Sequence, residues 1–186
     1  MNHLRLLPSP PNGAPHPDDA CLAAFQQELD YIFRTLRRLG VGASEAEDLA
    51  HEVFLVLRRK WGEYDQSRPL RPYLFGIAFR VAGAHVRKRV REVPQLTLTP
   101  EAPETMQPEL ALQTKQTRAV VLAALDQIPL PRRAVLVMHE IDEVPMHDVA
   151  ATLSIPLFTA YSRLRKARKE LASVIRRLVA GGEASL

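Results

Sequence analysis

Hydrophobic positions recur at steps of three and four along most of the chain, the spacing that places them on one face of an α-helix. The first such helix is predicted to end at Gly40. Ser44 and Glu47 form a predicted capping box for a second helix. A third helix is predicted over residues 73–91, with Pro72 in its first turn. The expected core positions of these three helices are Phe25, Leu29, Ile32, Phe33, Leu36, Leu39, Leu49, Val53, Val56, Leu57, Leu74, Ile77, Ala78 and Val81.

The helical pattern is interrupted over residues 93–114, which hold four prolines and whose only charges are three glutamates. We expect an acidic, flexible linker there, and fully extended at about 3.3 Å per residue it would span roughly 70 Å. Residues 1–17 hold five prolines and are predicted to form a disordered arm. The prediction is therefore an all-α protein with two small helical domains, residues 18–92 and 115–180, joined by this linker.

The second domain ends in a pattern typical of a helix-turn-helix. Pro145 is predicted to open a short helix, and a long helix follows the turn at residues 154–156 and ends at Gly181 and Gly182. The predicted buried seam of the long helix is Leu157, Leu164 and Leu171. The long helix is rich in basic residues and has a single acidic one, Glu170. The basic residues are Arg163, Arg165, Lys166, Arg168, Lys169, Arg176 and Arg177. Because the second helix of such a motif lies in the major groove, we predict DNA binding.

Composition narrows the classes of function. The net charge is only +4, so the clustering of charge is more informative than its sum. Cys21 is the single cysteine, which excludes an internal disulfide and a multi-Cys zinc site. No run of about 18 apolar residues and no signal peptide is evident, so we expect no membrane insertion and a cytoplasmic location.

Enzyme motifs are not supported by the spacing of the candidate residues. His51-Glu52 and His139-Glu140 match the start of a zinc-binding HExxH motif, but neither has a second histidine at the required spacing. No glycine-rich phosphate loop is evident either. We therefore expect no catalytic residues, no bound metal and no cofactor.

Residues 125–171 resemble region 4 of the sigma-70 family of RNA polymerase sigma factors. The matching positions are Ile128, Pro129, Glu140, Val149, Ala150, Leu153, Ile155, Pro156, Thr159, Ser162, Arg163, Leu164, Ala167 and Arg168. Ser154 stands where the family usually has glycine, so it would be strained if its backbone is left-handed. Phe158 and Tyr161 bring aromatic bulk to the start of the long second helix of this motif, the reading helix, which predicts an unusual base preference.

Residues 43–61 and 68–89 resemble region 2 of the same family, with Tyr73 in place of the usual tryptophan and Ala84 in place of an aspartate. No region 3 lies between the two regions, which is the pattern of the extracytoplasmic-function (ECF) group. The resemblance implies a protein that binds core RNA polymerase and promoter DNA. It also implies an anti-sigma factor as a further partner.

Four polar residues of the second predicted helix are candidates for polymerase binding. The helix dipole accounts for acids in the first turn, but Asp48 and Glu52 lie deeper and four residues apart, where like charges repel slightly. A basic partner would relieve this repulsion, and the resemblance implies one in the β′ clamp helices. The predicted polymerase-binding residues are Glu47, Asp48, His51 and Glu52.

Aromatic residues lie among bases over residues 58–91, a combination that binds an unpaired strand through stacking and phosphate neutralisation. Trp61, Phe75 and Phe79 are better explained as core residues. The resemblance implies that this region traps melted −10 DNA. The predicted −10 residues are Tyr64, Arg68, Arg71, Tyr73, Arg80, Arg87, Lys88 and Arg89.

The first turns of the reading helix are predicted to contact the −35 element. Bases would be read by Tyr161, Ser162, Arg165 and Lys166, and phosphates held by Thr159, Arg163 and Arg168. Arg163 and Arg165 lie about 200° apart on the helix, so they cannot both face the groove floor. The resemblance further implies that this domain contacts the β flap of the polymerase.

Two other functions would account for part of the sequence pattern. A stand-alone helix-turn-helix regulator would bind palindromic DNA as a dimer and would need no polymerase, but the acidic helix and the N-terminal basic patch fit it poorly. An inactive decoy would bind an anti-sigma factor alone. Binding to core polymerase separates these alternatives.

Overall fold

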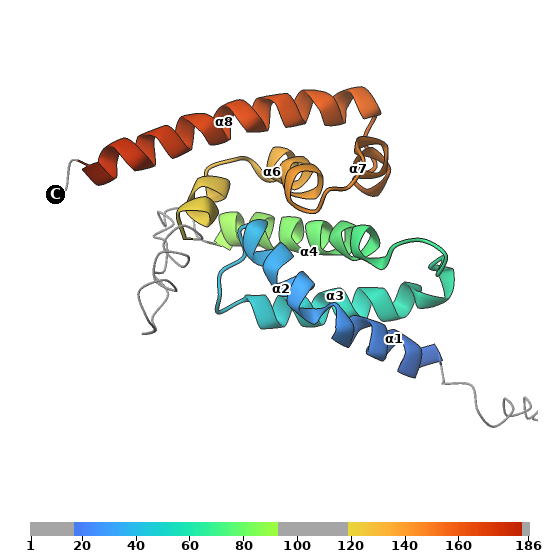
Figure 1. Cartoon of the computed structure of the whole chain (residues 1–186). Coiled ribbons are helices and arrows are strands. Elements are labelled where there is room, and N and C mark those ends of the chain that lie inside the picture. The colour runs from blue at the N-terminus through green and yellow to red at the C-terminus, as the bar shows by residue number, and fades with distance from the viewer. Residues whose placement is uncertain (1–16, 93–118, 184–186) are drawn as a thin grey trace, which may run out of the picture.

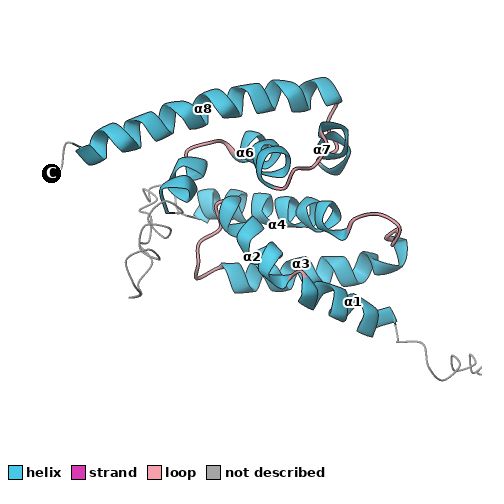
Figure 2. Ribbon diagram, viewed as in Figure 1, coloured by secondary structure: helices cyan, strands magenta, loops and turns pink. Residues whose placement is uncertain are grey.

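The structure is a computed structural model that describes residues 17–92 and 119–183 (Figure 1). The described residues form helices joined by short loops and contain no β-strand (Figure 2). This confirms the all-α prediction. The predicted N-terminal arm, apart from Pro17, and the predicted linker lie outside the described residues.

The N-terminal half consists of four α-helices and one 3-10 turn. They are α1 (Pro17–Gln27), α2 (Leu29–Arg38), α3 (Ala46–Lys60), η1 (Trp61–Glu63) and α4 (Leu70–Glu92). The single first helix expected from the sequence is broken at Glu28, which is a turn residue between α1 and α2. Gly40 has a φ of +93°, a left-handed conformation that suits glycine and ends the second helix.

The capping box predicted at Ser44 and Glu47 is wrong. Helix α3 begins at Ala46, and the preceding residue, Glu45, makes no side-chain capping bond. The Glu45 carboxylate lies instead 3.2 Å from His85 Nε2 and 3.5 Å from Arg89 Nη1, both on α4. The start of α3 is therefore stabilised by contacts with α4 rather than by a local cap.

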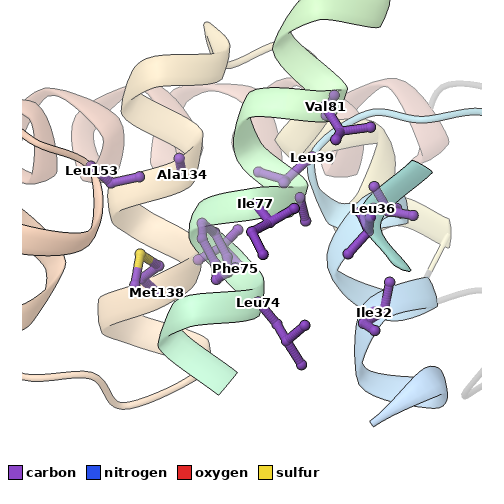
Figure 3. Close-up of a cluster of buried hydrophobic side chains, with 14 of the residues drawn as sticks. Ile32, Leu36, Leu39, Leu74, Phe75, Ile77, Val81, Ala134, Met138 and Leu153 are labelled. Carbon is purple, nitrogen blue, oxygen red and sulfur yellow. The ribbon is translucent and has the colours of Figure 1, made fainter. Parts of the chain in front are cut away.

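The predicted apolar faces of α2, α3 and α4 meet in the core of this half. Ile32 and Leu36 of α2 and Leu74 and Ile77 of α4 are almost fully buried. Figure 3 shows these side chains lying between the two helices. Phe75 is also fully buried, as its interpretation as a core residue requires.

The C-terminal half contains a helix over residues 119–126, followed by α6 (Leu130–Leu136), the π-helical turn η2 (Val137–Ile141), α7 (Met146–Thr152) and α8 (Leu157–Glu183). Helices α7 and α8, with the turn between them, are the predicted helix-turn-helix. Ser154 in this turn has a φ of +54°, so the residue that replaces the family's glycine is left-handed, the condition under which strain was expected.

Two details of α8 differ from the prediction. The helix continues through Gly181 and Gly182 to Glu183, because an interior glycine weakens a helix by only about 1 kcal/mol and does not forbid it. Leu157 is 45% exposed, so it is not part of the buried seam. The residues that face the core at the start of α8 are Ala160, Leu164 and Ala167, with steps of three and four.

The two halves pack against each other through α4, a feature that the sequence did not predict. Figure 3 shows Ala134, Met138 and Leu153 of the C-terminal half on the opposite side of α4 from Ile32 and Leu36. Gly76 permits this close approach, since a Cβ atom there would lie 3.1 Å from Thr152 Cγ2. An interior helical glycine costs about 1 kcal/mol relative to alanine, and here the cost is offset by packing.

Polar contacts also join the halves. Tyr31 Oη donates a 2.8 Å hydrogen bond to Asp142 Oδ2, and Arg38 Nη1 lies 3.2 Å from Asp142 Oδ1. Gly40 lies against the buried Arg133 guanidinium, where a Cβ atom would be only 2.2 Å from Nη1. Arg133 is held in turn by a 2.8 Å bond to the Asp126 carboxylate. In the described residues, the two helical domains therefore pack directly against each other.

Candidate polymerase and nucleic-acid interfaces

The four predicted polymerase-binding residues lie together on the outer face of α3. Glu47, Asp48, His51 and Glu52 are all exposed, and at about 100° per residue they span an arc of roughly 140°. The opposite face of α3 is buried, through residues such as Leu49 and Val53. The helix therefore presents three carboxylates and an imidazole to any partner that approaches this side; this is the acidic face of α3.

An aromatic row marks the turn between α3 and α4. The ring centroids of Trp61 and Tyr64 are 5.6 Å apart, and those of Tyr64 and Tyr73 are 4.9 Å apart. The Tyr64 hydroxyl donates a hydrogen bond to the Arg68 carbonyl. Burial, with the nearby charge of Asp65, raises the pKa of Tyr64, so its phenol remains neutral and able to stack. All three residues are half-buried, so part of each side chain remains accessible.

The predicted −10-binding residues on helix α4 fall into two groups, which lie on different faces of the helix. Tyr73, Arg80 and Arg87 recur at seven-residue steps, which places them within about 40° of one another on one strip of the helix. Arg80 and Arg87 are exposed. From Tyr73 to Arg87 the helix rises about 21 Å at roughly 1.5 Å per residue. This strip is long enough to contact several successive nucleotides of one strand.

Arg71 and Arg89 belong to a different face of α4 and are held in ion pairs. Arg71 Nε lies 2.9 Å from Glu28 Oε2, and its guanidinium is 5.3 Å from the Tyr31 ring centroid. Arg89 pairs with the Glu45 carboxylate described above. Arg68 and Lys88 are exposed, the former in the turn beside Tyr64. The strip of Tyr73, Arg80 and Arg87 is therefore the part of the predicted set that the fold aligns.

The predicted −35 residues all lie in the first three turns of α8. Arg165, Lys166 and Tyr161 are exposed, whereas Thr159, Ser162 and Arg163 are half-buried. Arg168 is exposed but bonded through Nε to Glu140 Oε1 at 2.9 Å. Arg165 and Arg163 thus differ in exposure, in line with their positions on nearly opposite sides of the helix.

A groove of about 370 Å³, here called the lateral groove, runs beside this part of α8. Its lining residues are Pro129, Pro131, Arg132, Phe158, Thr159, Ser162, Arg163 and Lys166. Arg132 also pairs with Glu170 at 2.9 Å. Three cations and two hydroxyls along an open groove are suited to a sugar–phosphate chain. Sequence reasoning did not place Arg132 at the site, and it noted Phe158 only as aromatic bulk that would alter base preference.

Among the described residues, no group of three or more His, Cys, Asp or Glu residues could hold a metal ion. None of the described helices is both long and apolar enough to cross a membrane. Cys21 is buried, and burial raises the pKa of its thiol, so it is a core residue of α1.

Two family models match the chain. Residues 24–92 match Sigma-70 region 2, and residues 118–171 match Sigma-70, region 4. The RNA polymerase sigma-H factor of Pseudomonas aeruginosa is 26% identical over 147 residues, which cover 74% of this chain and 76% of that protein. The ECF RNA polymerase sigma factor SigE of Mycolicibacterium smegmatis is 29% identical over 151 residues, which cover 78% of this chain but only 58% of that protein.

Solved structures show the same fold. The sigma factor RpoE in complex with the anti-sigma factor NepR from Bartonella quintana matches with a TM-score of 0.64 and 24% identity, over 82% of this chain and 97% of that one. CnrH in complex with the cytosolic domain of CnrY matches with a TM-score of 0.60 and 18% identity, over 85% of this chain and 88% of that one. With both family regions matched over most of the chain, and with ECF sigma factors among its relatives, the chain belongs to the sigma-70 family of RNA polymerase sigma factors, in its ECF group.

Proposed function

We propose that this chain binds core RNA polymerase and directs it to promoters, with residues 18–92 acting on the polymerase and the −10 element and residues 115–180 acting on the −35 element. The observation that carries this proposal is the coexistence of an acidic outer face on α3 with a basic helix-turn-helix in a sigma-70 chain. The role consists of binding and strand separation, takes place in the cytoplasm, and requires no covalent chemistry.

Docking is assigned to the acidic face of α3. Asp48 and Glu52 are exposed and lie on one side of the helix, so a basic partner can neutralise both at once. Such charge complementarity mainly raises the association rate and excludes acidic partners. The β′ clamp helices are the partner that the family suggests, and the β flap is the partner suggested for the C-terminal half.

Melted −10 DNA is assigned to the aromatic row and the α4 strip. The rings of Tyr64 and Tyr73 are partly accessible, and stacking of an unpaired base on such a ring contributes about 1–3 kcal/mol per base. Arg80 and Arg87 extend the strip along α4 and can neutralise successive phosphates of the same strand. Arg68 and Lys88 would contribute at its margins, whereas Arg71 and Arg89 would first have to leave their ion pairs with Glu28 and Glu45.

The −35 element is assigned to α8. Its exposed side carries Arg165 and Lys166, which can reach base edges in the major groove. The half-buried Thr159 and Arg163 line the lateral groove, where a phosphate chain would lie. Tyr161 and Ser162 would complete the base-reading set, with Arg168 on the backbone.

The packed arrangement has a consequence for this function. By their names, the −10 and −35 elements are centred about 25 base pairs apart, or roughly 85 Å at about 3.4 Å per base pair. Two halves joined by Tyr31, Asp142 and the Gly76 contact cannot span that distance while they remain in contact. We therefore infer that the halves separate when the chain engages polymerase and promoter. An anti-sigma factor, the type of partner present in the RpoE–NepR structure, is a further proposed partner of the unengaged chain.

The proposal is tested by mixing the full chain with core polymerase and selecting promoter fragments from a random library. A sigma factor should co-purify with core and enrich two separated motifs with a fixed spacing. A stand-alone regulator should not co-purify with core polymerase and should enrich a palindromic motif. A decoy should enrich no DNA, with or without core.

A further inference from the structure

Phe158 is the most exposed large hydrophobic side chain among the described residues. It is the second residue of α8, and 83% of its surface is accessible. Leu157 and Tyr161 beside it are 45% and 56% exposed. Single exposed hydrophobic residues are common on protein surfaces, but three within five positions at one end of a basic helix form a patch that a partner is expected to cover.

The position of Phe158 on α8 indicates what that partner is. At about 100° per residue, Phe158, Ser162, Arg165 and Lys169 fall within roughly 60° of one another and form one line along the helix. This line lies on the side away from the buried Ala160, Leu164 and Ala167. Phe158 therefore heads the same outward line that carries Arg165, the strongest candidate for contact with a base edge.

The lateral groove fixes how DNA would lie against this line. Arg132, Arg163 and Lys166 line it together with Thr159 and Phe158. A phosphate chain in the groove would place the neighbouring base edges against the outward line of α8. The cations beside the apolar patch favour a polyanion with apolar groups over an acidic or an apolar protein surface alone.

The chemistry of the major groove offers one group that fits a phenyl ring. Each base edge there presents hydrogen-bond donors and acceptors, and only thymine adds a methyl group. Phenylalanine can neither donate nor accept a hydrogen bond, so it would leave polar edges unpaired at any other base. A thymine methyl is the contact that buries the ring without this penalty.

We propose that Phe158 determines specificity at one −35 position by contacting the C5-methyl group of a thymine. This inference rests on the proposed binding of α8 to the −35 element. Because Phe158 lies one helical turn before Ser162 and two before Arg165, the thymine should flank the bases that these residues contact. The preference would add to the hydrogen-bond readout of Arg165 rather than replace it.

The test first removes the thymine methyl group from the DNA and then repeats the measurement with the Phe158 side chain changed. Promoters are first selected with holoenzyme formed from core polymerase and the full chain. Each thymine of the selected −35 element is then replaced by deoxyuridine, which lacks only the C5-methyl, and binding is measured by competition. One position should lose about fourfold in affinity, equivalent to ~0.8 kcal/mol for one buried carbon.

The same scan is repeated with Phe158→Ala, Phe158→Leu and Leu22→Ala. Leu22 is 42% exposed on α1, far along the chain from α8, and serves as the matched control. The deoxyuridine effect should vanish in Phe158→Ala, persist partly in Phe158→Leu and be unchanged in Leu22→Ala. Since Phe158 is almost fully exposed, these substitutions remove no core contact.

Three results would overturn the inference. The deoxyuridine effect could be absent in the natural chain, or it could remain in full in Phe158→Ala. Alternatively, Phe158→Ala could lower affinity equally for every −35 sequence, which would assign the patch to a protein surface of the polymerase. Failure of the natural chain to bind core or to select any −35 motif would overturn the proposed function as well, so the two failures are distinguishable.

Discussion

Removing one hydroxyl group at the contact between the halves should shift the chain toward the separated form. The Tyr31 ring is buried, and its hydroxyl donates to the Asp142 carboxylate, whose side chain is only 10% exposed. In Tyr31→Phe the carboxylate loses this donor in the packed form, but it would be hydrated in the separated form. A hydrogen bond to a charged group is worth about 1.5–3 kcal/mol, so the packing equilibrium should change by about 2 kcal/mol, or roughly 30-fold.

Two measurements report this shift. Small-angle X-ray scattering should give a larger radius of gyration for Tyr31→Phe than for the natural chain. Titration with core polymerase should give a tighter apparent affinity, by up to about 30-fold, because a smaller fraction of the chain is held in the form that cannot engage. Asp18→Asn is the matched control, since the ion pair between Asp18 and Arg58 lies entirely within the N-terminal half. Unchanged scattering and unchanged core affinity in Tyr31→Phe would refute the inference that the packed form must open.

Three further outcomes are expected. Asp48→Lys with Glu52→Lys should weaken core binding more than tenfold while circular dichroism stays helical; unchanged affinity would remove docking from the acidic face of α3. Arg165→Ala should relax base preference at one −35 position, whereas Arg163→Ala should weaken all sequences evenly and lower the salt slope by about one; two identical flat losses would reduce α8 to an electrostatic anchor. Burial raises the pKa of Asp142 above its ordinary value, so the packed form binds this proton more tightly. Packing should therefore strengthen as pH falls from neutral toward about 4 and weaken as pH rises through the raised pKa, and scattering across that range should show no trend if this reasoning is wrong.

Periodic features of single helices were predictable from the sequence. The outer and buried faces of α4 follow from residues such as Leu74 and Ile77, because a 3.6-residue period assigns each position to one side. The replacement of the family's glycine by Ser154 marked a position where a left-handed backbone would be strained, and the residue is left-handed. In each case the determinant is local, so the order of residues is sufficient.

Features that depend on contacts between distant segments were not predictable. The start of α3 is set by Glu45 reaching His85 and Arg89 across to α4, which no local capping pattern reveals. Likewise, Gly76 lies inside a helix where glycine is unfavourable, and only the approach of Thr152 explains it. The seven-residue spacing of Phe158 and Arg165 puts both on one line of the helix, but the exposure of Phe158 depends on how α8 packs.

The central claim is tested most directly by transcription with purified components. Core polymerase, the full chain and a promoter selected by the resulting holoenzyme should produce a discrete run-off transcript, and neither core alone nor the chain alone should do so. The amount of transcript should fall with Asp48→Lys and Glu52→Lys together. A chain that binds the same DNA without core, or that yields no transcript with it, would contradict its assignment as an initiation factor.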